Sequence, residues 1–139
     1  MNLLGGCMLN DIKLTPVEWE IMEAIWKLGG APSIREVLGH AFPNGEKAYT
    51  TVQTVMNILV KKGLLESNKV GLVNFYSPAK SRDEMVRAEM TQIVSRVFHG
   101  SIPAVANYLI NSEDIKIGEI QAIKKLLDEK ESELKGKKS

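Results

Sequence analysis

Residues 49–63 place short hydrogen-bonding side chains along one side of a predicted helix. The apolar residues of this stretch recur at helical spacing and form one stripe: Val52, Val55, Met56, Leu59 and Val60. The opposite stripe consists of Thr50, Gln53, Thr54, Asn57 and Lys61. Threonine and asparagine are poor helix formers, so several on one face indicate a role beyond solubility. Because hydroxyl and amide groups can hydrogen-bond to base edges and phosphates, this face is a candidate DNA-reading surface.

The segment that follows distinguishes a DNA-reading helix from a helix whose polar face only meets solvent. On the helix alone, the two interpretations are equally favoured. Gly63 suits the left-handed backbone that ends a helix. Residues 64–70 and 72–77 then form two runs around Gly71, and Pro78 ends the second, a pattern typical of a β-hairpin. A polar-faced helix followed directly by a hairpin indicates a winged helix-turn-helix, whose helix enters the DNA groove.

Lysines gather around the end of this helix and the first run of the hairpin. A lysine ammonium carries charge but cannot form a bidentate hydrogen-bond pair with a base. We therefore expect contacts to phosphates from Lys61, Lys62 and Lys69. The first turns of a recognition helix meet the base edges. The predicted DNA contacts are therefore Thr50, Thr51, Gln53, Thr54, Asn57, Lys61, Lys62 and Lys69.

The composition limits the other functions that the chain could have. Its 139 residues suit one compact domain with an appendage, and the net charge of +1 argues against a polybasic, non-specific nucleic-acid binder. There is no apolar run long enough to span a membrane, and residues 1–13 do not resemble a signal peptide. The single cysteine, Cys7, allows no internal disulfide or cysteine cluster. We therefore expect a cytoplasmic protein with no catalytic residue, metal or cofactor.

Capping motifs predict two helices before the recognition helix. Thr15 to Glu18 form a capping box, and the helix that follows has Trp19, Met22, Ile25 and Trp26 on its core face. Ser33 to Glu36 repeat the motif for a short helix that ends near residues 39–41. With the third helix at 50–62, residues 14–78 are expected to form a winged-helix DNA-binding domain.

The rest of the chain predicts three amphipathic helices, at 82–98, 102–110 and about 117–134, before a solvated tail. Ser81 to Glu84 form the capping box of the first. The last two helices expose the apolar residues Ile102, Val105, Leu109, Ile120, Ile123 and Leu127. These helices either fold back on the winged helix or pair with a second chain, and the frequency of symmetric pairing favours a homodimer. The fold class is thus mainly α with a small β-hairpin wing, in which 81–135 form a helical dimerisation region.

Several motifs in this order resemble the penicillinase-repressor family, which includes the methicillin-resistance repressors. They lie within about residues 14–130 and comprise Leu14–Met22 with Ile25–Trp26, Ala48–Val52, Leu59–Leu65, Tyr76–Pro78, Phe98–Ser101, and Glu119–Ile120 with Leu126–Leu127. The resemblance implies a homodimeric winged-helix repressor that binds inverted-repeat operators in double-stranded DNA. It also implies base reading from Thr50, Thr51, Gln53 and Thr54. At two positions where the family often has arginine, this chain has Ile58 and Leu72.

The mode of release and two other functions remain open. Well-known family members leave DNA when a sensor protease cuts an Asn–Phe bond near the Gly-Ser segment, and the matching bond here is Ser101–Ile102. One alternative function is a winged-helix regulator that holds a small ligand in its dimer interface. The other is a winged-helix protein-interaction module without DNA binding. The near-neutral charge slightly favours the module, whereas the polar stripe and the lysines count against it.

Overall fold

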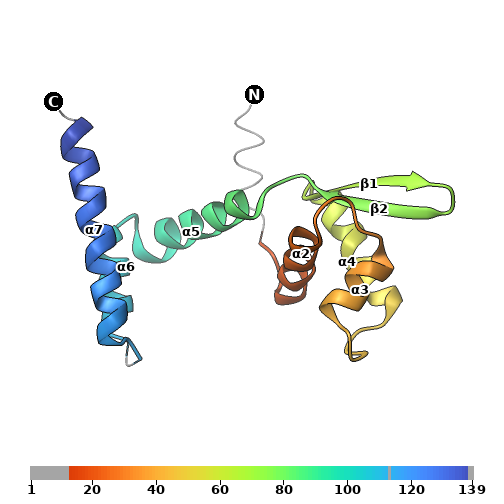
Figure 1. The fold of residues 1–139 in the computed structure, drawn as a ribbon, viewed down its shortest axis with the longest axis horizontal. Helices are drawn as coiled ribbons and strands as arrows, with labels where there is room; N and C mark the ends of the chain where they lie inside the picture. Colours follow the sequence, from red (N-terminus) through yellow and green to blue (C-terminus); the bar gives the residue numbers. More distant parts are fainter. Residues whose placement is uncertain (1–12, 113, 138–139) are drawn as a thin grey trace. The chain divides into compact units, whose positions relative to one another are not determined.

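The computed structural model describes residues 13–112 and 114–137, so Cys7 lies outside the described residues. The helices are α2 (Pro16–Leu28), α3 (Ile34–Ala41), α4 (Tyr49–Lys61), α5 (Arg82–Phe98), α6 (Ile102–Ile110) and α7 (Ile117–Lys137). Strands β1 (Leu65–Val70) and β2 (Val73–Pro78) form an antiparallel hairpin between α4 and α5 (Figure 1). This order confirms the predicted fold class, a winged helix-turn-helix followed by a helical region.

The three predicted capping boxes are present and start α2, α3 and α5. At α2, the Thr15 Oγ1 accepts from the Glu18 N–H at 3.2 Å, and the Glu18 Oε1 accepts from the Thr15 N–H at 2.8 Å. Ser33 and Glu36 exchange the same pair of bonds at α3. Ser81 and Glu84 do so at α5. Each box satisfies two donors that a helix start otherwise leaves unpaired.

The core of the winged helix lies between the inner faces of α2, α3 and α4. Its fully buried members include Ile21 and Ile25 of α2, Val37 of α3 and Met56 of α4. The predicted core face of α2 is therefore only partly right. Met22 and Ile25 are buried, but Trp19 and Trp26 only pack against the edge of the core, where their rings are 6.0 Å apart. Ile21, which the prediction left out, is in the centre because it lies one helical turn before Ile25.

The end of α4 determines where the wing begins. Gly63 has a φ of 81°, the left-handed conformation expected from the sequence. Its N–H donates to the Val60 carbonyl, and the Leu64 N–H donates to the Leu59 carbonyl, each at 3.0 Å. These two bonds define a Schellman motif, which turns the chain sharply out of a helix. Leu64 is buried directly after the turn, so the hairpin starts against the core.

The hairpin has a two-residue turn at Gly71 and Leu72. Val70 pairs with Val73, and the register continues to Leu65 opposite Pro78. Gly71 has a φ of 63° at the first position of the turn. A glycine with positive φ at this position is typical of the tight turns that match the twist of two antiparallel strands. The turn leaves Leu72 94% exposed at the tip of the wing.

The described residues fall into two compact units, which divide within α5 after Gln92. The first unit contains the winged helix and the start of α5, whose Met85 is buried in the core. The second unit contains the end of α5, α6 and α7. The predicted domain limits, 14–78 and 81–135, remain predictions.

Helix α7 is longer than the sequence predicted. It continues past Leu134 to Lys137, into the segment expected to be a solvated tail. Lys135 pairs with Glu131 at 3.9 Å, and Lys137 pairs with Glu133 at 3.8 Å. Such pairs four residues apart, with cations at the helix C-terminus, favour an additional helical turn.

Candidate nucleic-acid interface

Helix α4 presents its polar residues to solvent and its apolar residues to the core. Val52, Met56 and Leu59 are fully buried. On the other side, Thr50, Thr51, Thr54 and Asn57 are exposed, and Gln53 is half-buried. The structure thus brings five of the eight predicted DNA contacts together on one helical surface. We call this set, Thr50, Thr51, Gln53, Thr54 and Asn57, the reading face.

One hydrogen bond joins the reading face to the wing. The Tyr76 hydroxyl of β2 donates to the Asn57 Oδ1 at 3.1 Å. Burial, and to a smaller extent the nearby Tyr49 phenol, raise the pKa of Tyr76, which keeps this hydroxyl protonated. Because Tyr76 itself is buried, the bond fixes the position of the hairpin along α4.

The three predicted phosphate-contacting lysines have different surroundings. Lys61 and Lys69 are exposed, with no ion pair to any other described residue. In contrast, the Lys62 Nζ lies 3.0 and 2.9 Å from the two carboxylate oxygens of Glu18 and 3.2 Å from the Lys13 carbonyl oxygen. Glu18 is almost fully buried, so Lys62 neutralises a charge of the core. Lys62 therefore joins the C-terminal end of α4 to α2, and its contact with DNA stays a prediction.

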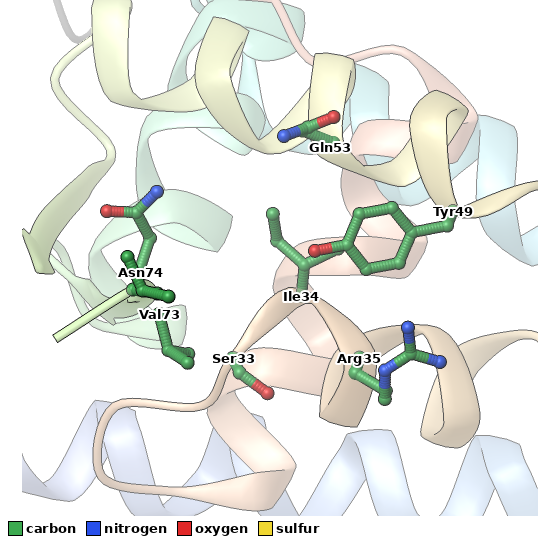
Figure 2. Close-up of a pocket in the computed structure, with 8 residues that line it drawn as sticks. Ser33, Ile34, Arg35, Tyr49, Gln53, Val73 and Asn74 are labelled. Atoms are coloured by element: carbon green, nitrogen blue, oxygen red, sulfur yellow. The ribbon is translucent and has the colours of Figure 1, made fainter. Parts of the chain in front are cut away.

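A cleft of about 340 Å³ lies between the start of α3, the reading face and the wing. Gln53 of α4 and Asn74 of β2 line it, together with Ile34 and Arg35 of α3 and the N-cap residue Ser33. Figure 2 shows the amide groups of Gln53 and Asn74 and the hydroxyl of Tyr49 around the same opening. No carboxylate lines this cleft. The cleft therefore lies next to the reading face and adds neutral hydrogen-bonding groups and one cation, Arg35, to the same polar surface.

Arg35 and Tyr49 are candidate functional residues that the sequence did not reveal. The guanidinium carbon of Arg35 lies 5.3 Å from the centre of the Tyr49 ring, within the range of a cation–π interaction. Neither residue belongs to the polar stripe of the recognition helix, and they lie on different helices. No periodicity links them, because their contact depends on how α3 crosses α4.

Four of the six predicted interface residues of α6 and α7 are exposed within the second unit: Ile102, Leu109, Ile123 and Leu127. Ile102 and Leu127 are each 64% exposed and Leu109 is 55% exposed, while Val105 and Ile120 are half-buried. Leu109 and Ile123 line one hollow of about 280 Å³, together with the loop between the two helices. Exposed apolar side chains in such number on two neighbouring helices are typical of a surface that binds another chain.

The bond that corresponds to the family's cleavage site lies at the start of α6. The Ser101 Oγ caps this helix by accepting from the Ala104 N–H at 3.1 Å. Ile102, the first residue of the helix, is well exposed. Release by a sensor protease stays one of the modes that the sequence leaves open.

The described residues contain neither a candidate metal site nor a candidate membrane span. Within residues 13–112 and 114–137, histidine, cysteine and acidic residues nowhere form a group of three that could hold a metal ion. In the same part of the chain, no helix combines the length and the apolar character needed to cross a membrane.

Comparisons with known proteins identify the family. The family model for the penicillinase repressor matches residues 14–129. The penicillinase repressor of Bacillus licheniformis is 23% identical over 117 residues, which are 84% of this chain and 91% of that protein. The transcriptional regulator BlaI of Mycobacterium tuberculosis is 27% identical over 121 residues, 86% of each chain.

One solved structure among the matches contains DNA. It is the monomeric form of Bacillus licheniformis BlaI in complex with the blaP half-operator, with 29% identity and a TM-score of 0.45 over 52% of this chain and 88% of that one. The two curated relatives described above are named as a repressor and as a transcriptional regulator. Because the family model covers most of its length, the chain belongs to the penicillinase repressor family.

Proposed function

We propose that the chain is a transcriptional repressor that binds inverted-repeat operator DNA as a homodimer. The reading face carries this proposal, because it combines exposed hydroxyl and amide groups with a buried apolar stripe on one helix. Membership of a family whose curated relatives are named repressors supports it.

In this proposal α4 enters the major groove and the wing lies along the neighbouring backbone. A B-DNA major groove is about 12 Å wide and accepts one helix. The reading face would then meet base edges, while Lys61 and Lys69 would contact phosphates at the end of the helix and on the wing. The Tyr76–Asn57 bond links the wing to α4, so the wing would follow this helix at the groove.

The homodimer part of the proposal rests on the apolar faces of α6 and α7. Covering Ile102, Leu109, Ile123 and Leu127 with the same residues of a second copy removes them from water. A two-fold axis then presents two reading faces to two half-sites, about 34–36 Å apart or a multiple of this distance. The interface set comprises Ile102, Val105, Leu109, Ile120, Ile123 and Leu127, within a dimerisation region at 81–135.

Selection of bound sequences from random duplex DNA tests the proposal. We expect an inverted repeat, and we expect a promoter carrying it to lose expression when the chain is present. Failure to enrich any sequence would contradict sequence-specific binding. Enrichment of a single half-site or a direct repeat would contradict the symmetric dimer only.

The Gln53→Ala variant tests whether α4 reads bases. Gln53 has both a donor and an acceptor and can form a bidentate contact with adenine. Its loss should cost about 1–3 kcal/mol on the selected site and little on a scrambled duplex. Lys69→Ala is the matched comparison, because a phosphate contact should be lost on both duplexes alike. Binding isotherms on the two duplexes decide; equal losses for Gln53→Ala would show that this residue does not read sequence.

The Leu72→Arg variant tests the position of the wing. Leu72 stands where the family often has arginine, and its side chain is almost entirely exposed, so the fold should accept the change. If the wing lies along the backbone, the new cation should strengthen binding to all duplexes and steepen the salt dependence by about 0.9 in slope. Leu72→Gln, which adds a polar group without charge, is the control. Identical salt slopes for the two variants would place the wing tip away from DNA.

A further inference from the structure

We propose that Arg35 holds a phosphate of the DNA backbone in the cleft between α3, α4 and the wing, and so positions the reading face on the bases. This role rests on the proposed function, because it adds a contact to the same DNA-binding surface. It assigns Arg35 as the contacting residue and Tyr49 as the residue that orients it.

Arg35 differs from the other arginines of the first unit in its partners. Arg82 pairs with Glu23 at 2.9 Å, and Arg87 pairs with Asp83 at 3.1 Å. Among the described residues, no carboxylate lies within ion-pair distance of Arg35. Its charge is therefore available to an external anion.

Tyr49 restricts where the Arg35 side chain can lie. The Tyr49 ring lies 5.3 Å from the guanidinium carbon. An arginine held by an aromatic face keeps the N–H groups of its planar fork free for a second partner, and that fork matches the oxygens of a phosphate. Tyr49 is also the first residue of α4. An anion on Arg35 would therefore be placed directly beside the helix that carries the reading face.

The rest of the cleft suits the same ligand. Gln53 of α4 and Asn74 of β2 line the cleft with neutral amide groups, and Figure 2 shows Asn74 across the opening from Tyr49 and Arg35. No acidic residue lines the cleft, so no carboxylate there would repel a phosphate. Because Gln53 belongs to both the cleft and the reading face, a phosphate held here would lie next to the first bases that α4 reads.

Binding isotherms at several salt concentrations test the assignment on the selected and scrambled duplexes. Arg35→Ala should weaken binding about tenfold on both. The salt slope should fall by about 0.9, as expected for one lost phosphate contact. Arg87→Ala is the matched control, because it removes the same charge from an exposed ion pair of the same unit. Tyr49→Phe keeps the ring face and should retain more affinity than Tyr49→Leu.

Neutral methylphosphonates, placed one at a time along the selected duplex, locate the contact. At one position per half-site, the methylphosphonate should weaken DNA binding by the wild-type protein but not by Arg35→Ala. Melting curves should show that both proteins are folded. If Arg35→Ala lost no more DNA affinity than Arg87→Ala, the assignment would be overturned. It would also be overturned if Arg35→Ala bound more weakly than the wild-type protein whichever phosphate was neutralised. If the wild-type protein bound no duplex, the proposed function itself would fail, and this assignment with it.

Discussion

Ile123→Glu is expected to convert the protein to a monomer and to abolish high-affinity operator binding together. Ile123 lies on α7 beside Leu109, in the apolar surface that a second copy would cover. Ile123 is 37% exposed within one chain, so covering the rest contributes about 0.6–1.1 kcal/mol in each of the two copies. Burying a glutamate carboxylate at the same position without a partner adds a larger cost. The dimer dissociation constant should therefore rise at least a hundredfold, which corresponds to about 2.7 kcal/mol.

Light scattering over a range of protein concentrations, together with binding to the selected duplex, measures both effects. Gln121→Glu is the matched control, because it adds the same charge to an exposed position of α7 outside the apolar set. This variant should remain dimeric and bind DNA. A wild-type protein that is monomeric at micromolar concentration would refute the dimer, and a dimeric Ile123→Glu would place the interface elsewhere.

Lys62→Met is expected to lower the free energy of unfolding by about 2 kcal/mol, because it leaves the Glu18 carboxylate buried without its cation. The side chain of Glu18 is 6% exposed and that of Lys62 is 30% exposed. Breaking a fully buried pair costs about 3–5 kcal/mol, and the partial exposure of Lys62 reduces that figure. Removing both charges, as Glu18→Gln with Lys62→Met, should restore part of the stability.

The neighbouring lysine is the control that separates stability from DNA binding. Lys61 is exposed and makes no ion pair with another described residue, so Lys61→Met should leave denaturant unfolding unchanged. It should weaken binding to all duplexes if Lys61 contacts a phosphate. Equal stability of the two variants would show that the Glu18–Lys62 pair does not support the core.

Local features of the fold were predictable because they depend on residues close together in the chain. A capping box needs two side chains three positions apart, so Thr15, Ser33 and Ser81 predicted the starts of three helices. The apolar stripe of α4 follows from its periodicity, which predicted the residues that face solvent on that helix. Gly63 predicted the end of α4, since its positive φ is costly for other residues.

Contacts between elements were decided only by the tertiary structure. Lys62 and Lys61 are adjacent and chemically identical in sequence, yet only Lys62 reaches Glu18, which lies 44 positions earlier in the chain. Arg35 meets Tyr49 for the same reason, because the crossing of α3 and α4 places them together. The sequence by itself thus determined the helices, apart from the end of α7, the wing and the residues of the reading face. Packing determined which charged side chains are used within the protein and which remain available to a partner, since that depends on distances between segments remote in sequence.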